Sequence, residues 1–303
     1  MADLAFLFPG QGAQTVGMGK QLYDQLPAVK NLFEQANDIL GYDLTKVCFE
    51  GPKETLDATE HSQPALLLTS CAALEWLKAN EPEVIERCDR AAGLSLGEYT
   101  AMVFAEALTF EDGLKLVRER GLAMQAAADA QPSGMVSVLG LEADKVNELC
   151  DAARQDGEIL QIANYLCPGN IVVSGHQASC QKAVELAADH GAMKAIPLSV
   201  AGAFHTAIME PAESRLKAAL ASVTINPPKL PVISNVDGKA HSDPDDIRAT
   251  LVKQVCSPVL WNDSITGILQ SGTDEFIEVG TGRVLKGLMK RINRKAKCRS
   301  LSE

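Results

Sequence analysis

The order of predicted elements within residues 133–198 places a narrow limit on the fold. Apolar patterns and breaker residues there predict a strand, a helix, two strands, a helix and a final strand. That order is the ferredoxin-like arrangement. Breakers at Gln131-Pro132-Ser133-Gly134 and at Pro197 bound the segment. We therefore expect 133–198 to be a small ferredoxin-like domain inserted into a larger one, which 1–132 and 199–303 form together. The expected strands are 135–139, 160–163, 171–174 and 195–198, and the expected helices are 142–153 and 178–190.

Strands and helices also alternate through the rest of the chain. Buried-strand patterns occur at 4–8, 91–93, 230–234 and 275–279. Helical periodicity occurs at 18–40, 64–77, 98–128 with breaks, 211–221, 247–255 and 284–293. Such alternation is typical of an α/β fold with a mainly parallel sheet, and this is the fold class that we predict.

The composition excludes several classes of protein. The chain has 303 residues, of which 46% are hydrophobic and 22% charged, as in folded globular proteins. Its net charge of −11 argues against nucleic acid as a partner. No apolar run approaches the roughly 18 residues of a membrane-spanning helix, and the N-terminus lacks the basic region of a secretory signal. We therefore expect a cytoplasmic protein that has no membrane partner.

The cysteines are scattered, and none forms a CxxC pair or lies near a histidine at metal-ligand spacing. We expect reduced, mostly buried thiols and no metal site. The eight are Cys48, Cys71, Cys88, Cys150, Cys167, Cys180, Cys256 and Cys298.

Charge is unevenly distributed along the chain. Residues 283–303 carry a net charge of +7, whereas 1–282 carry −18. A basic segment on an acidic body suggests a local site for an anionic partner. The alternative is a solvated helix end, where cations are favourable for the helix itself.

Gly93-Leu94-Ser95-Leu96-Gly97 fits the pattern G-x-S-x-G between a predicted strand and a predicted helix. In a nucleophile elbow the serine occupies this tight turn, and the glycines leave room for the backbone and for an acyl group. The N–H of Leu96 could then stabilise an oxyanion. The pentapeptide alone is a weak signal, but the flanking elements favour Ser95 as a nucleophile.

A serine hydroxyl needs a base to take its proton. His205 is the candidate that we favour, because Gly202-Ala203-Phe204 before it could form a packed wall beside a substrate. A core or loop histidine without a catalytic role remains the alternative. The other histidines, in polar loops or within a helix, are His61, His176, His190 and His241.

Phe8-Pro9-Gly10-Gln11-Gly12 ends a predicted strand at the sheet edge where ligands bind. Its glycines would let backbone N–H groups approach a ligand, although a simple strand–helix turn explains them equally well. The segment is not a dinucleotide fingerprint, because Thr15 stands where that motif needs glycine, and the chain has no P-loop.

Arg118 and Arg120 lie on a predicted helix. An arginine fork suits a carboxylate because it donates two parallel hydrogen bonds. On the residues alone, a solvated surface charge is the usual explanation of any single arginine, and we favour it here.

Taken together, seven segments resemble the malonyl-CoA:acyl carrier protein transacylases in order and approximate spacing. The resemblance extends from about residue 3 to residue 297, and seven motifs in one order are highly specific. The segments are Phe8-Pro9-Gly10-Gln11-Gly12, Gln63-Pro64-Ala65-Leu66, Gly93-Leu94-Ser95-Leu96-Gly97-Glu98-Tyr99, Arg120-Gly121, Gly202-Ala203-Phe204-His205, Gln254 with Pro258-Val259 and Trp261, and Glu278-Val279-Gly280.

The resemblance implies an α/β-hydrolase-like large domain with a ferredoxin-like insert. It also implies roles for individual residues. Ser95 would be the nucleophile, His205 its base, and the backbone carbonyl of Gln254 would orient His205. The N–H groups of Gln11 and Leu96 would form the oxyanion hole. Substrate-binding residues would be Arg120, which would hold the malonyl carboxylate, Phe204, which would limit room for a branched acyl group, and Asn164.

The chain departs from the family pattern at a few positions. Leu94 stands where the family usually has histidine, which removes a polar neighbour of the nucleophile. Leu166 and Asn170 replace the common asparagine and glutamine, and Thr281 replaces a usual proline.

The resulting prediction is transfer of malonyl from malonyl-CoA to the phosphopantetheine thiol of an acyl carrier protein in fatty-acid biosynthesis, through malonyl-Ser95. We expect a monomer that needs no metal or redox cofactor. A polyketide or specialised lipid pathway is equally compatible with the sequence. Two other functions stay open: a serine hydrolase or thioesterase of related fold, and an inert carrier-binding module, which Leu94 would favour.

Overall fold

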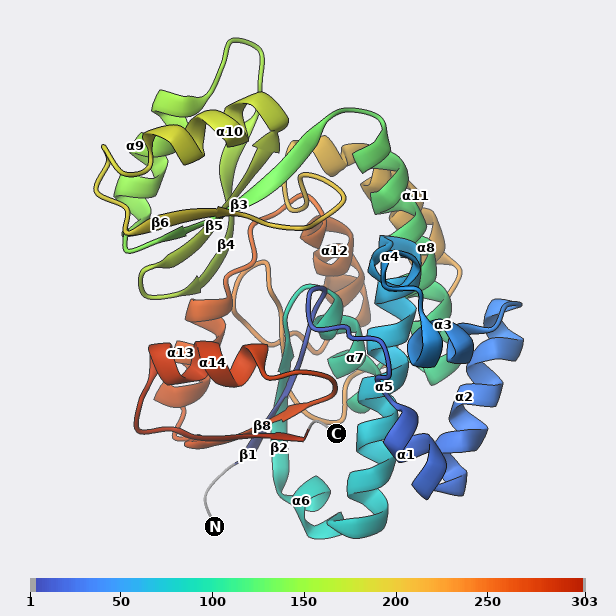
Figure 1. The fold of residues 1–303 in the computed structure, drawn as a ribbon. Helices are drawn as coiled ribbons and strands as arrows, with labels where there is room; N and C mark the ends of the chain where they lie inside the picture. Colours follow the sequence, from blue (N-terminus) through green and yellow to red (C-terminus); the bar gives the residue numbers. More distant parts are fainter. Residues whose placement is uncertain (1–3, 302–303) are drawn as a thin grey trace.

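A computed structural model describes residues 4–301, which form two separate β-sheets with helices packed around them (Figure 1). The larger sheet is entirely parallel and has the strand order β7-β2-β1-β8-β9. Phe6 of β1 pairs with Ala91 of β2 on one side and with Ile277 of β8 on the other. The strands are β1 (Leu4–Phe8), β2 (Cys88–Gly93), β7 (Val232–Ile233), β8 (Glu275–Val279) and β9 (Lys297–Leu301).

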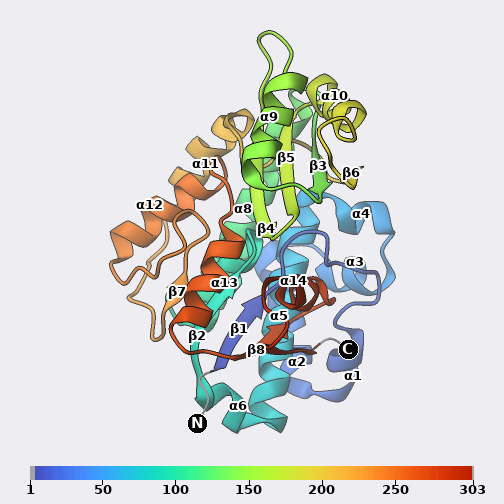
Figure 2. The same cartoon turned by 90° about the vertical axis from the view of Figure 1, so that its left-hand side faces the viewer.

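Helices cover both faces of this sheet, which explains why β1 is apolar at every position. Phe6 and Phe8 point into the main core, which contains the buried side chains of α5 (Thr59–Asn80). Ala5 and Leu7 point to the opposite face, against α13 (Trp261–Gln270) and α14 (Val284–Ile292). Figure 2 shows these two helices in front of the sheet. The other helices of the large part are α1 (Lys20–Gln25), α2 (Pro27–Leu40), α3 (Leu44–Glu50), α4 (Lys53–Asp57), α6 (Pro82–Arg87), α7 (Leu96–Phe104), α8 (Phe110–Asp129), α11 (Glu210–Ala221) and α12 (Pro244–Gln254).

The smaller sheet is antiparallel and has the order β4-β5-β3-β6. Two helices cover one of its faces, α9 (Ala143–Ala153) and α10 (Gln177–Leu186). This order and these crossovers are those of a ferredoxin-like unit, so the predicted α/β fold class is confirmed. The assignment of domains to 1–132 with 199–303 and to 133–198 stays a prediction. The strands are β3 (Ser133–Leu139), β4 (Leu160–Cys167), β5 (Asn170–His176) and β6 (Lys194–Pro197).

Strand β4 also joins the small sheet to the larger part of the molecule. Asn164 forms a parallel bridge with Val259, just before α13. The N–H of Tyr165 donates to the Val259 carbonyl at 2.9 Å, and the N–H of Val259 donates to Ala163 at 2.8 Å. The cleft between the two sheets is therefore fixed along this side.

Two helix predictions were wrong at prolines. The helix expected over 18–40 is divided into α1 and α2, because Pro27 begins the second helix and Leu26 before it is extended at φ −126°. The helix expected to open at Pro64 begins at Thr59, and Pro64 lies inside it.

Sequence reasoning missed several elements, among them α13 and β9. Strand β9 is polar and lies at the sheet edge, where Lys297 and Arg299 alternate with Cys298, so its apolar pattern is weak. Within residues 4–301, no helix is both long and apolar enough to cross a membrane.

Candidate active site

The turn at Ser95 connects β2 directly to α7 at the carboxyl edge of the parallel sheet. Ser95 has φ 52° and ψ −101°, a conformation that costs a non-glycine residue about 1–3 kcal/mol. Glycine is required on either side of it. A Cβ atom at Gly97 would lie 2.1 Å from the Phe8 carbonyl oxygen, and one at Gly93 would lie 1.9 Å from the Gly97 carbonyl carbon. The G-x-S-x-G pattern thus forms the predicted elbow.

The Ser95 hydroxyl contacts the imidazole that sequence reasoning favoured. Ser95 Oγ lies 2.9 Å from His205 Nε2, and His205 Nδ1 lies 2.8 Å from the backbone oxygen of Gln254. Because a carbonyl only accepts, Nδ1 carries the proton, and Nε2 of the neutral ring is free to accept from the hydroxyl. This geometry allows proton transfer from Ser95 to His205.

The pKa of His205 is lowered to about 4. Burial is the main cause, since the side chain is only 3% exposed, and the positive charge of Arg120 acts in the same direction. His205 is therefore neutral at neutral pH, as a proton acceptor must be.

Arg120 of α8 is buried beside this pair and has only neutral hydrogen-bond acceptors. It donates to Gln63 Oε1 at 2.8 Å, to Ser95 Oγ at 2.9 Å and to Gln254 Oε1 at 2.9 Å. Among residues 4–301, no carboxylate forms an ion pair with it. Burial lowers the pKa of Arg120. The charge of the buried Glu98 acts on Arg120 without forming an ion pair with it. A buried cation that lacks a paired carboxylate is costly, so this site favours an anionic ligand.

A cavity of about 180 Å³ opens in front of these groups. The predicted residues Gln11, Ser95, Leu96, Arg120, Asn164, Phe204 and His205 all line it. Gln254 lies behind it, in contact with Ser95, Arg120 and His205. The structure thus brings all eight predicted site residues together.

Gln11 and Leu96, whose backbone N–H groups are the predicted oxyanion donors, both line this cavity. Within the described part of the chain, neither group donates to a protein acceptor. They are therefore available to a ligand oxygen. Their role as an oxyanion hole stays a prediction.

Most of the cavity wall is apolar, and two departures from the family pattern contribute to it. Leu94 and Leu166 line the cavity, and each packs against the cluster of buried side chains around α13 and α14. Leu94 therefore fits an apolar wall and leaves the contact between Ser95 and His205 intact.

Sequence reasoning assigned no role to three polar residues that border the site. Gln63 accepts from Arg120, while Glu98 and Asn235 bond to each other below Ser95. Gln63 and Glu98 stood inside quoted motifs, so those motifs were a usable signal. The only sequence signal for Asn235 was its place directly after a predicted strand.

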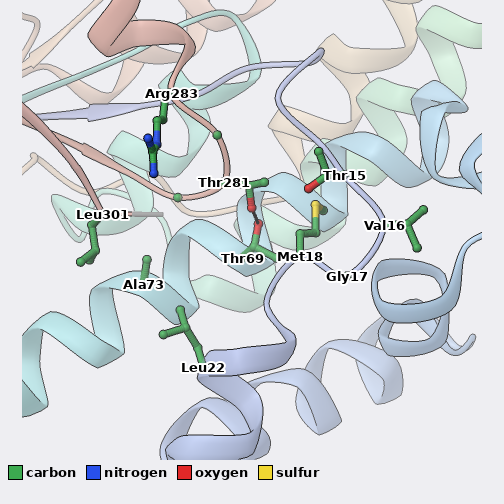
Figure 3. A pocket seen from close by; sticks show the side chains of 12 residues that line it. Thr15, Val16, Gly17, Met18, Leu22, Thr69, Ala73, Thr281, Arg283 and Leu301 are labelled. Atoms are coloured by element: carbon green, nitrogen blue, oxygen red, sulfur yellow. Dashed lines mark hydrogen bonds between the residues drawn. The ribbon is translucent and has the colours of Figure 1, made fainter. Parts of the chain in front are cut away.

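A second hollow, of about 490 Å³, lies on the far side of the loop after β8 (Figure 3). Thr15, Thr69, Thr281 and Arg283 supply its polar lining, and Thr281 Oγ1 lies 3.4 Å from Thr69 Oγ1. Thr281, another departure from the family pattern, is not part of the lining of the cavity at Ser95. The hollow contains no pair comparable to Ser95 and His205.

Part of the basic C-terminal segment has structural partners. Lys297 pairs with Glu275, Arg299 pairs with Glu81, and Arg291 donates to the carbonyl groups of residues 168 and 169. Lys286 and Lys290 are exposed on α14, whose first residue, Val284, lines the cavity. The helix that begins at the cavity wall thus carries exposed positive charge farther along it.

Within residues 4–301, no group of three or more His, Cys, Asp or Glu side chains could hold a metal ion.

The model of the acyl transferase domain family matches residues 5–299. The chain belongs to the acyl transferase family.

Known relatives of this acyl transferase match it over nearly their full length. It is 44% identical over 303 residues to a malonyl CoA-acyl carrier protein transacylase of Bacillus subtilis, covering all of this chain and 94% of the relative. A structure of such a transacylase from Coxiella burnetii has a TM-score of 0.95 at 38% identity, covering 99% of this chain and 94% of the other. A malonyl-transacylase in complex with a type II PKS acyl-carrier protein has a TM-score of 0.95 at 34% identity, covering 100% and 96%.

We expect the His205 ring of this acyl transferase to titrate near pH 4, which proton NMR of the ring Cε1–H resonance measures. Between about pH 6.5 and pH 4 the unfolded chain binds a proton here that the folded chain does not, so acidification lowers the free energy of unfolding. Arg120→Met should raise the midpoint. Arg118 is on the same helix as Arg120, α8, but donates to the Leu40 carbonyl on α2. Arg118→Met should therefore leave the midpoint of His205 unchanged. A midpoint at the ordinary value of about 6.5 would contradict the argument.

Proposed function

We propose that this acyl transferase moves malonyl from malonyl-CoA to the phosphopantetheine thiol of an acyl carrier protein in fatty-acid biosynthesis, through a malonyl-Ser95 ester. The observation that carries the proposal is the position of Ser95 Oγ, which lies 2.9 Å from both His205 Nε2 and Arg120 Nη2. One atom thus contacts a neutral base and a cation that forms no ion pair among the described residues. The names of the full-length relatives support the same substrates.

The first half-reaction loads the enzyme. Ser95 Oγ attacks the thioester carbonyl of malonyl-CoA while His205 Nε2 accepts the hydroxyl proton. The N–H groups of Gln11 and Leu96 stabilise the oxyanion. When the C–S bond breaks, His205 returns the proton to the departing CoA thiolate, which leaves malonyl-Ser95 and CoA-SH.

The second half-reaction runs the same steps in reverse with another thiol. His205 takes the proton of the phosphopantetheine thiol, and the sulfur attacks the malonyl ester carbonyl. Ser95 leaves as an alkoxide that recovers the proton from His205. One thioester is exchanged for another, so the balance requires no redox cofactor and no metal.

Arg120 accounts for selection of a dicarboxylic acyl group. In malonyl, one methylene separates the free carboxylate from the carbonyl that Ser95 attacks. A group that binds the carboxylate must therefore lie next to the nucleophile, as Arg120 does. Asn164 and Phe204 complete the wall around the acyl group.

We also propose a monomer in the cytoplasm. All eight cysteines are free thiols and six of them are buried, which fits a reducing compartment.

Mixing the protein with malonyl-CoA should produce a malonyl adduct, detected by intact-protein mass spectrometry. Ser95→Ala should abolish it, because no other nucleophile lies at His205 Nε2. In the presence of a holo carrier protein, the adduct should move to its thiol. Release of malonate into water instead would favour the hydrolase alternative, and carrier binding without any adduct would favour the inert module.

Arg120→Ala should reduce malonyl transfer by about 100-fold or more relative to acetyl transfer. Malonyl loses its counter-ion, whereas acetyl has no carboxylate to lose. Competition between malonyl-CoA and acetyl-CoA, read by adduct mass, measures the ratio. Equal losses for the two substrates would refute the role given to Arg120.

Charge reversal at Lys286 and Lys290 should raise KM for the carrier protein, with an effect that shrinks as salt increases. KM for malonyl-CoA is the internal comparison. It should rise as well if the CoA phosphates bind at Lys286 and Lys290, and stay unchanged if they do not. Lys78→Glu, a reversal on α5, is the matched control. Unchanged carrier kinetics would instead identify α14 as a solvated helix face.

A further inference from the structure

Side-chain amides hold the backbone of Ser95 at both of its polar groups. The N–H donates to Asn235 Oδ1 at 2.6 Å, and the carbonyl accepts from Gln254 Nε2 at 3.1 Å. Ser95 lies at φ 52°, outside the regions that a non-glycine residue usually adopts. Such a residue persists only where its surroundings over-determine it. The two amides are contacts of that kind.

One buried carboxylate oxygen ties these two amides to each other. Oε2 of Glu98 accepts the N–H of Asn235 at 3.0 Å and Nε2 of Gln254 at 2.6 Å. Asn235 Nδ2 also donates to the Gly93 carbonyl at 2.7 Å, so this amide spans the elbow. All three side chains are fully buried. Water therefore cannot replace these bonds if they break.

The same residues reach the base as well as the nucleophile. The backbone carbonyl of Gln254 accepts from His205 Nδ1, and its side-chain oxygen accepts from Arg120. A shift of Gln254 would therefore displace His205 and Ser95 together. Glu98 and Asn235 are not part of the cavity lining, so they act through these neighbours.

We propose that Glu98 and Asn235 are positioning residues of the transfer reaction. Oε2 of Glu98 holds Asn235 and Gln254 against the two sides of the Ser95 backbone, and this keeps Ser95 Oγ within hydrogen-bond distance of His205. The proposal rests on the proposed function, in which Ser95 is the nucleophile and His205 the base. Misplacement of reacting groups by about 1 Å costs about 100-fold in rate, so loss of this support should slow acylation strongly.

Two substitutions of Glu98 separate the acceptor from the bulk of the side chain. Glu98→Gln keeps an amide oxygen for the position of Oε2 and places its NH₂ where Oε1, which has no partner among the described residues, now lies. Glu98→Leu has similar volume but no acceptor. We expect single-turnover acylation by malonyl-CoA, followed by mass spectrometry, to stay within about tenfold of wild type in Glu98→Gln and to fall about 100-fold in Glu98→Leu.

The split between kcat and KM distinguishes positioning from general damage. KM for malonyl-CoA should change little in Glu98→Leu, because Arg120 and the cavity wall remain. Circular dichroism and melting temperature establish that the variant is folded. A folded Glu98→Leu enzyme that acylates at the wild-type rate would overturn the proposal.

Asn235→Ala decides the matter if Glu98→Leu does not fold. Its matched control is Asn37→Ala. The side-chain amide of Asn37 on α2 makes two hydrogen bonds to Thr45 on α3, away from the site. Acylation should fall about 100-fold in Asn235→Ala and stay at the wild-type rate in Asn37→Ala. A wild-type rate in folded Asn235→Ala would overturn the proposal. A wild-type enzyme that forms no adduct at all would instead count against the proposed function.

Discussion

The site depends on a guanidinium that lies in the protein core without a carboxylate partner. Among the described residues, Arg120 donates to the neutral oxygens of Gln63, Ser95 and Gln254 and forms no ion pair. Its charge, added to burial, lowers the pKa of His205. Burial also raises the pKa of Glu98, whose charge acts on Arg120, to about 7, so this carboxyl compensates the cation incompletely. At a solvated surface the same charge would be screened and would neither tune the base nor attract an acyl carboxylate.

The geometry of the parallel sheet explains how distant segments meet at this cation. Strands β1, β2 and β7 are neighbours and end at one edge of the sheet, which brings Gln11, Ser95 and Asn235 to one place. Helices α8 and α12 supply Arg120 and Gln254. The small sheet closes the opposite wall through Asn164 on β4. The parallel sheet, the two helices and the small sheet each contribute residues to the site, and none of them forms it alone.

Much of this could be predicted from the sequence, and the failures have physical causes. Alternating strands and helices revealed the fold class, and local chemistry pointed to Ser95 and His205. The eight predicted residues converge on one site, although their catalytic roles remain predictions. Asn235 was not found because its contact with Ser95 depends on β7 lying next to β2, and no local pattern encodes the order of strands in a sheet. The start of α5 at Thr59 was missed because a proline usually opens or ends a helix. The buried surroundings of Pro64 instead keep it inside α5.

The bridge between Asn164 of β4 and Val259 bears on the order in which CoA and the second thiol occupy the site. A wide swing of the small sheet would first have to break the backbone hydrogen bonds of Tyr165 and Val259. The cavity beside Ser95 has a volume of about 180 Å³. That room suits one short acyl chain and not two pantetheine arms side by side. In the proposed reaction CoA would therefore depart before the second thiol enters, and the malonyl ester would hold the acyl group between the two half-reactions.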